Sequence, residues 1–191
     1  MNKITSYVLS FSLFFSSAIA YAKNNDVNSV QLNGQVSVLT LSNSDFTITL
    51  NHKSISLGEG WSDDVEKNIG QSQTDDFVGT VDYGDETYKF YRHQYDGLDV
   101  YTSNLWWDKA ERTVDDYIIA QITLKSSELK TSRGASVGIS LTQLHTLYGT
   151  GQVTESNGTQ RIHYSYGKKR ISFKIAGDKV SSIIMSYNKE D

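Results

Sequence analysis

The chain has 191 residues, with 18 Lys and Arg against 22 Asp and Glu and a formal net charge of −4. This mild acidity, without a dense basic tract, disfavours nucleic acid and anionic lipid as partners. The absence of cysteine excludes disulfides, cysteine nucleophiles and a lipidated cysteine.

The first 22 residues have the pattern of a cleavable secretory signal peptide. Lys3 supplies a positive charge, residues 7–15 form a short apolar stretch, and Ala20-Tyr21-Ala22 fits an A-x-A cleavage site. The apolar stretch is too short to span a bilayer, which needs roughly 20 apolar residues. We therefore expect cleavage near Ala22, a location in the periplasm or the medium, and no membrane anchor.

The region behind the signal peptide begins with polar, Asn-rich residues 23–34, which are typical of a flexible leader. Period-2 alternation over residues 35–41 and 45–50 then predicts an N-terminal β-hairpin. No proline and no long linker divides the rest of the chain. We expect one α+β unit of two subdomains, residues 35–128 with the hairpin and a first repeat, and residues 129–191 with a second.

The internal repeat is the main organising feature of the sequence. Ser62 stands in the N-cap position of a two-turn helix that ends at Gly70, and Ser140 and Gly149 take the same positions in the second copy. Each helix is followed by three predicted strands, at residues 86–95, 98–103 and 117–124 in the first copy and at 160–166, 170–175 and 180–187 in the second. The sequence therefore predicts an α+β fold: two repeats of a short helix followed by an antiparallel three-stranded meander, after an N-terminal β-hairpin.

The two predicted helices each have one apolar side. Val65 with Ile69, and Leu144 with Leu147 or Tyr148, are spaced so that each pair lies on one helical face. We expect these residues to face the core.

The repeat resembles a known structural group. Its marks are Leu57-Gly58 or Val137-Gly138 before the helix, Ile69-Gly70 or Tyr148-Gly149 at its end, and the meander that follows. Over residues 55–187 this is similar to the fold shared by the small outer-membrane assembly lipoproteins of the SmpA/OmlA type and the tandem-repeat β-lactamase inhibitory protein. The resemblance implies an exported, non-enzymatic protein that docks on other proteins. The chain departs from it by lacking the lipidated cysteine of the first branch and the disulfides of the second.

Catalytic and metal-binding motifs do not stand out in the sequence. The histidines at 52, 93, 145 and 163 lack metal-ligand spacing, and no serine sits in a G-x-S-x-G motif. The paired carboxylates lie in predicted caps and loops, where solvation and helix capping explain them. We expect no enzyme activity, no cofactor and no metal site, and we expect His93 and His163 to be half-buried, hydrogen-bonded imidazoles on strands.

Aromatic residues provide the candidate binding site, since 3 Trp and 12 Tyr are many for a chain of this size. In an extended segment Trp106 and Trp107 would point to opposite faces, so that one indole enters the core and the other, beside Asp108, stays exposed. Tyr91 and Tyr95 share one face of the predicted strand 86–95 and would add a tyrosine-rich surface. We predict that these five residues bind a partner.

Taken together, these features favour an exported protein that binds another protein, as a periplasmic inhibitor or immunity protein that neutralises a toxin or hydrolase of the cell envelope. Two alternatives stay open. A glycan- or small-ligand-binding envelope module is one, because exposed aromatic rings also stack on sugars. A hydrolase with a dispersed active site is the other.

Overall fold

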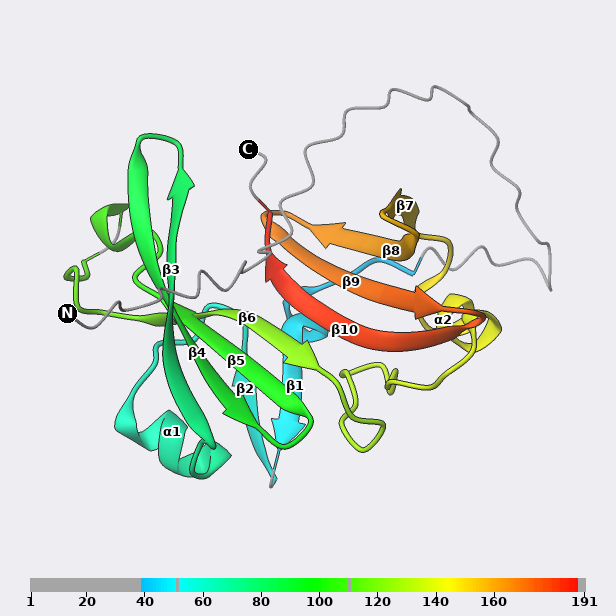
Figure 1. Ribbon diagram of the computed structural model, residues 1–191, viewed down its shortest axis with the longest axis horizontal. Coiled ribbons are helices and arrows are strands. Elements are labelled where there is room, and N and C mark those ends of the chain that lie inside the picture. The colour runs from blue at the N-terminus through cyan, green and yellow to red at the C-terminus, as the bar shows by residue number, and fades with distance from the viewer. Residues whose placement is uncertain (1–38, 51, 110, 189–191) are drawn as a thin grey trace, which may run out of the picture. The chain divides into compact units, whose positions relative to one another are not determined.

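The computed structural model describes residues 39–188, apart from residues 51 and 110 (Figure 1). The predicted signal peptide at 1–22, the leader at 23–34 and the start of the predicted hairpin at 35–38 lie outside the described residues. Within the described part, no helix is both long enough and apolar enough to cross a membrane.

An antiparallel sheet of eight strands is the framework of the described chain, in the order β3-β4-β5-β6-β10-β9-β8-β7 (Figure 1). The strands of its first half are β3 (Thr74–Tyr83), β4 (Glu86–Tyr95), β5 (Leu98–Ser103) and β6 (Ile118–Leu124). Those of its second half are β7 (Gln152–Ser156), β8 (Thr159–Tyr166), β9 (Lys169–Ala176) and β10 (Lys179–Tyr187). The two halves meet where β6 pairs with β10.

Shorter elements complete the described chain. A separate hairpin joins β1 (Thr47–Leu50) to β2 (Lys53–Ser56), and the α-helices are α1 (Asp63–Ile69) and α2 (Leu141–Tyr148). The predicted pairing of residues 35–41 with 45–50 is therefore wrong for the described residues, because residues 39–42 form no strand and β1 pairs with β2. Two 3₁₀-helices, η1 (Asn43–Phe46) and η2 (Trp107–Lys109), lie before β1 and after β5.

The predicted fold class is wrong. The described chain is mostly β, with one continuous eight-stranded sheet and two α-helices, and does not consist of two repeats of a helix and a three-stranded meander. The strands absent from the prediction, β3 and β7, are the two edges of the sheet. An edge strand pairs on one side only and exposes much of its length, so its apolar alternation is weak.

The two helices begin and end where the capping residues predict. The Ser62 hydroxyl accepts a hydrogen bond from the backbone N–H of Val65, and the Ser140 hydroxyl accepts one from the N–H of Gln143. The Gln143 side chain in turn accepts from the N–H of Ser140, which completes a capping box. Gly70 and Gly149 end the helices, so the predicted helix limits are confirmed.

The main core lies between one face of the sheet and the two helices with the β1-β2 hairpin. The predicted core positions of the helices are confirmed as buried, namely Val65 and Ile69 in α1 and Leu144 and Tyr148 in α2. The hairpin contributes Ile48 and Ile55, and the sheet contributes Leu98, Ile122, Phe173 and Ile183. Burial of one such aliphatic side chain stabilises the fold by about 1.5–3 kcal/mol.

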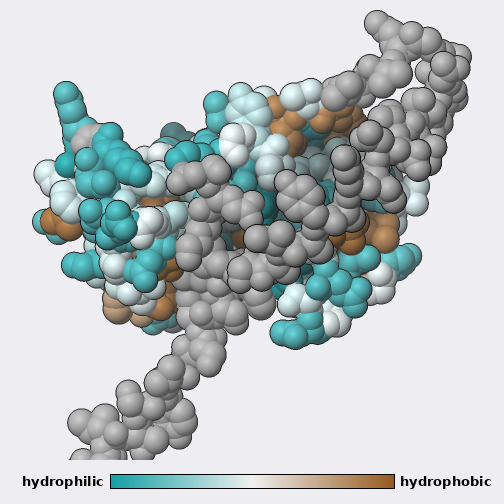
Figure 2. All heavy atoms as spheres, turned by 90° about the horizontal axis from the view of Figure 1, so that it is seen from above, coloured by the Kyte–Doolittle hydropathy of each residue, from teal (hydrophilic) through white to brown (hydrophobic). Residues whose placement is uncertain are grey.

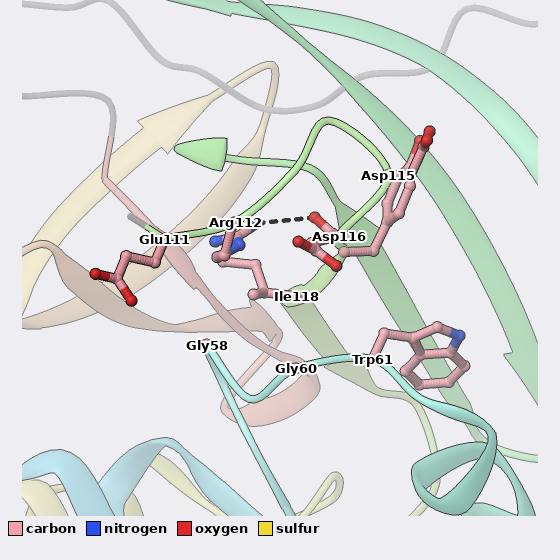
Figure 3. Close-up of a pocket in the computed structure, with 9 residues that line it drawn as sticks. Gly58, Gly60, Trp61, Glu111, Arg112, Asp115, Asp116 and Ile118 are labelled. Carbon is pink, nitrogen blue, oxygen red and sulfur yellow. Dashed lines mark hydrogen bonds between the residues drawn. The ribbon is translucent and has the colours of Figure 1, made fainter. Parts of the chain in front are cut away.

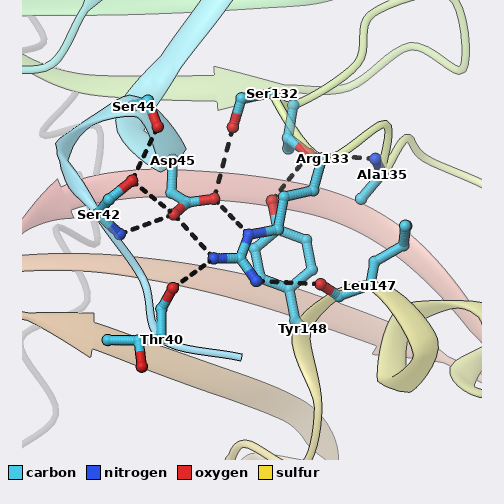
Figure 4. Close-up of polar contacts among 10 residues, drawn as sticks. Thr40, Ser42, Ser44, Asp45, Ser132, Arg133, Ala135, Leu147 and Tyr148 are labelled. Atoms are coloured by element: carbon cyan, nitrogen blue, oxygen red, sulfur yellow. Dashed lines mark hydrogen bonds and ion pairs between the residues drawn. The ribbon is translucent and has the colours of Figure 1, made fainter. Parts of the chain in front are cut away.

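A buried ion pair fastens η1 to the segment that precedes α2 (Figure 4). Asp45 is 3% exposed and accepts hydrogen bonds from Nε and Nη2 of Arg133, whose guanidinium lies 5.1 Å from the centre of the Tyr148 ring. Burial alone would raise the pKa of Asp45, but hydrogen bonds from Arg133 and Ser42, together with the charge of Arg133, outweigh it and lower that pKa. The ion pair therefore joins segments that are far apart in the sequence.

Candidate binding site

A shallow groove lined by aromatic and acidic residues runs beside the start of β6. It consists of two adjoining hollows of about 600 and 380 Å³, which share Trp61, Asp115 and Tyr117. The larger hollow also contacts Glu111, Arg112 and Asp116, and the smaller one also contacts Tyr91, His93 and Thr102. Figure 3 shows the larger hollow between the segment that carries Gly58, Gly60 and Trp61 and the loop that carries Glu111 to Asp116. We call the two hollows together the aromatic groove.

The backbone of residues 58–61 places Trp61 in this groove. The N–H of Gly58 donates to the carbonyl of Ile119, and the N–H of Trp61 donates to the carbonyl of Tyr117, both at 2.8 Å. Gly58 has a φ of 92°, and a Cβ there would collide with the Tyr187 hydroxyl, so glycine is required for this path. The pairing holds Trp61 beside Tyr117.

His93 supports the ring of Trp61. The two rings stack with centroids 4.4 Å apart and planes inclined by 24°. Nδ1 of His93 lies 2.7 Å from the Asp75 carboxylate, and Nε2 lies 3.0 Å from the Thr102 hydroxyl. Because a carboxylate only accepts hydrogen bonds, Nδ1 carries a proton. The imidazole is thus held between β3 and β5. The predicted hydrogen-bonded histidine on a strand is confirmed, but its side chain is buried and not half-buried.

His163 is held in a comparable way on β8. Its Nε2 lies 2.6 Å from the Thr154 hydroxyl and its Nδ1 lies 2.8 Å from the Ser172 hydroxyl, so it also connects the strands on either side. Burial, with the charges of Arg170 and Arg161, lowers the pKa of His163 to about 4. The imidazole is therefore neutral at pH 7.

A row of aromatic rings continues from the groove to the edge of the sheet. Tyr117 meets Tyr91 edge to face at 5.5 Å, and Tyr91 meets Phe77 of β3 at 5.3 Å. Phe77 is 57% exposed and lies beside a β-bulge that precedes Gly79. A bulge turns the side chains next to it and twists an edge strand. The row therefore ends in an accessible phenyl ring.

The acidic side of the groove contains a carboxylate that no neighbour neutralises. Asp115 is exposed, and among the described residues its carboxylate has no hydrogen-bond or ion-pair partner. Burial raises the pKa of Tyr117, and the nearby Tyr91 hydroxyl and Asp115 carboxylate raise it further. Tyr117 therefore stays protonated at neutral pH.

The predicted binding residues do not form one site. Tyr91 lines the aromatic groove, but the structure contradicts the expected exposure of Tyr95, which is 7% exposed and belongs to the core. Trp106, Trp107 and Asp108 do not line either hollow. Only Tyr91 of the five predicted residues therefore lies in the groove.

The segment of Trp106 and Trp107 is not extended, so the prediction that their side chains alternate between opposite faces is wrong. Trp106 has a φ of 55°, in the left-handed region, and Trp107 begins η2. Both side chains are half-buried, and Trp106 lies 4.7 Å from the ring of Tyr187 and 6.2 Å from that of Tyr83. The Trp106 ring thus connects the end of the β3-β4 hairpin to the end of β10.

Asp108 is exposed but has an internal contact. Its carboxylate accepts a hydrogen bond of 2.9 Å from the hydroxyl of Tyr88, which is fully buried. This hydrogen bond within the chain gives the Asp108 carboxylate a structural role, so its presence does not point to a binding partner.

The predicted binding site did not include Trp61, Tyr117, Asp115 or Phe77. Trp61 and Asp115 lie outside any periodic segment, and Phe77 lies in an edge strand with little alternation. One signal was available, because a tryptophan between Gly60 and the helix-capping Ser62 is a large ring in a loop.

Exposed large hydrophobic side chains are few in the described part of the chain. On the face seen in Figure 2, the described residues are mostly hydrophilic, and apolar ones form small separate patches. The exposed large hydrophobic residues of the described chain are Leu39, Phe77, Val114, Val153 and Tyr166. A contact at the groove would therefore combine aromatic rings with polar groups.

The smaller hollow is lined by an imidazole and a hydroxyl that lie in line with a carboxylate. Asp75, His93 and Thr102 have the order of a catalytic triad, with contacts of 2.7 and 3.0 Å. Thr102, however, is 2% exposed and lies in β5, which pairs on both sides. A hydroxyl buried this deeply is poorly placed to attack a substrate.

A metal site is absent from the described residues, where no group of three or more His, Cys, Asp or Glu side chains could hold an ion.

Comparison with known proteins finds no match, whether to a family model, to a curated protein or to a solved structure. The resemblance noted in the sequence therefore stays a prediction.

Proposed function

We propose that this chain binds another protein through the aromatic groove, and that after export it acts as an inhibitor or immunity protein against a toxin or hydrolase of the cell envelope. The observation that carries the proposal is the aromatic row beside an unpaired carboxylate. Trp61, Tyr91 and Tyr117 surround the smaller hollow, and Asp115 lies at both hollows.

The composition of the groove supports a protein partner. Tyrosine and tryptophan are enriched at protein interfaces and among the residues that contribute most to binding. Here the rings are positioned by strand pairing and by stacking, as with Trp61 on His93. A surface that is ordered before binding loses less side-chain entropy on binding, which favours affinity.

A glycan is a second candidate ligand because the groove presents ring faces beside hydrogen-bonding groups. Trp61 and Tyr117 are half-exposed, and Asp115 could accept from sugar hydroxyls. Binding of soluble peptidoglycan fragments, followed by tryptophan fluorescence in the unaltered chain and in a Trp61→Phe variant, distinguishes this candidate from a protein partner.

The test is a comparative pull-down from periplasmic extract. The tagged chain is compared with a Trp61→Ala/Tyr117→Ala variant, and with Tyr166→Ala as a control for loss of an exposed ring on β8. We expect the unaltered chain and the control to recover one stoichiometric protein, and the groove variant to lose it while keeping its circular dichroism spectrum. Recovery of the same protein by the groove variant would refute the proposal, as would the absence of a stoichiometric partner.

A further inference from the structure

The smaller hollow of the aromatic groove has the chemistry of a cation site. Rings of Trp61, Tyr91 and Tyr117 surround about 380 Å³, and the carboxylate of Asp115 lies at its rim. Aromatic faces carry partial negative charge and attract an ammonium or guanidinium group placed over them. The three rings and the unpaired carboxylate therefore both favour a positively charged ligand group.

The charged groups of the adjoining larger hollow add to this preference. Glu111, Asp115 and Asp116 face one cation, Arg112. The guanidinium of Arg112 donates from Nη2 to the backbone carbonyl of Asp116 at 2.9 Å, and among the described residues it forms no ion pair with Asp115. The Asp116 carboxylate accepts a hydrogen bond from the N–H of Thr113, and Glu111 contacts only the larger hollow, so Asp115 is the carboxylate available to a ligand in the smaller hollow.

We propose that the smaller hollow receives a lysine or arginine side chain of the protein partner. The aliphatic stem of that residue packs against the rings of Trp61 and Tyr91, and its charged head meets Asp115 and the face of Tyr117. This inference rests on the proposed function and names the part of the partner that the groove recognises.

Other side chains fit the hollow less well. A carboxylate would meet the negative ring faces and Asp115, both of which repel it. An apolar side chain would remove water from Asp115 without giving that carboxylate a hydrogen-bond donor, which is costly. A basic side chain avoids both penalties, because it supplies donors and a compensating charge.

The experiment uses capped tripeptides as probes and the ¹⁵N-labelled chain. Gly-Lys-Gly and Gly-Arg-Gly are compared with Gly-norleucine-Gly, which keeps the stem and lacks the charge, and with N-acetylglucosamine. The readout is the indole N–H signal of Trp61, assigned with a Trp61→Phe variant. We expect saturable shifts with the two cationic peptides at about 10 mM, because one such contact supplies only a few kcal/mol.

Matched variants test the role of the carboxylate. Asp115→Asn should weaken binding of both cationic peptides about fivefold or more, whereas Asp85→Asn, an exposed change at the turn between β3 and β4, should leave it unchanged. Added salt should also weaken the binding.

Three results would overturn the inference: equal shifts with norleucine and lysine peptides, unchanged affinity in Asp115→Asn, or no shift with any peptide. Shifts with N-acetylglucosamine alone would replace the basic side chain with a sugar as the occupant. If the groove variant loses its protein partner but the peptides show no charge preference, the proposed function stands and this inference fails.

Discussion

Trp61 stacks on His93, and His93 is held between Asp75 and Thr102 on the strands at either side. The position of the groove's tryptophan is therefore set by side chains that belong to the sheet. A ring that stands on such a support is already in place when a ligand arrives, which reduces the entropy lost on binding.

Replacement of His93 by alanine should destabilise the fold by about 1–3 kcal/mol. The change leaves the buried Thr102 hydroxyl and the Asp75 carboxylate without the imidazole, and it removes the ring beneath Trp61. Urea unfolding measures the effect. His145→Ala on the exposed side of α2 is the control and should change stability by less than about 0.5 kcal/mol. Equal effects of the two changes would show that the imidazole does not support the groove.

Removal of one partner from the buried ion pair should reduce the stability of the fold more than replacement of His93 does. Arg133→Met leaves the Asp45 carboxylate buried and unpaired, which we expect to reduce the free energy of unfolding by about 3–5 kcal/mol at pH 7. Adding Asp45→Asn should recover part of the loss, since the buried charge is then gone. Lys67→Met breaks the exposed pair with Asp64 and should cost less than about 1 kcal/mol. A cost for Arg133→Met as small as that of Lys67→Met would contradict the buried pair.

The depressed pKa of His163 predicts a specific loss of stability in mild acid. Its pKa is about 4 in the fold against the ordinary 6.5, so between these values the unfolded chain binds more protons than the folded one. Neutral His163 therefore makes its full contribution to the free energy of unfolding above about pH 6.5, and this contribution falls as the pH drops toward 4. After allowance for solvent screening we expect a loss of about 1–2 kcal/mol.

His163→Gln should remove this part of the pH dependence, because glutamine does not titrate. Urea unfolding at about pH 7.5 and pH 5 provides the measurement, and the exposed His145→Gln should keep the original profile. An unchanged profile in His163→Gln would mean that other groups cause the acid sensitivity.

The helix residues that face the core should be sensitive to truncation. Leu144→Ala in α2 and Val65→Ala in α1 remove buried methyl groups and should destabilise by about 2–4 kcal/mol. Leu147→Ala removes the same atoms from a half-buried position on α2 and should cost less. Thermal unfolding compares the three variants, and unchanged stability in the first two would contradict the core described here.

Local chemistry explains which elements could be predicted from the sequence. Ser62 and Ser140 predict the helix starts because each serine hydroxyl bonds the backbone N–H only three residues later, which is a local interaction. The six inner strands could be recognised from their β-branched and aromatic residues, including β5, in which all residues are buried. The edge strands β3 and β7 bury little, and without them the continuous sheet could not be recognised.

The groove could not be predicted because it depends on contacts between distant segments. Trp61 and Tyr117 become neighbours only when residues 58–61 pair with the start of β6. Trp106 was misplaced for a different reason, since alternation assumes extended backbone and this residue has a positive φ. Tyr91 was found because its strand was predicted correctly.

Site-specific photo-crosslinking tests the central claim that the groove docks a protein. A photoreactive phenylalanine analogue replaces Phe77 on β3 or, as the control, Val153 on β7, which are 57% and 55% exposed and lie on opposite edge strands of the sheet. After irradiation of cells that produce each form, we predict one discrete covalent adduct with a second protein from position 77 and none from position 153. Adducts from position 153 alone, or from neither position, would contradict the account.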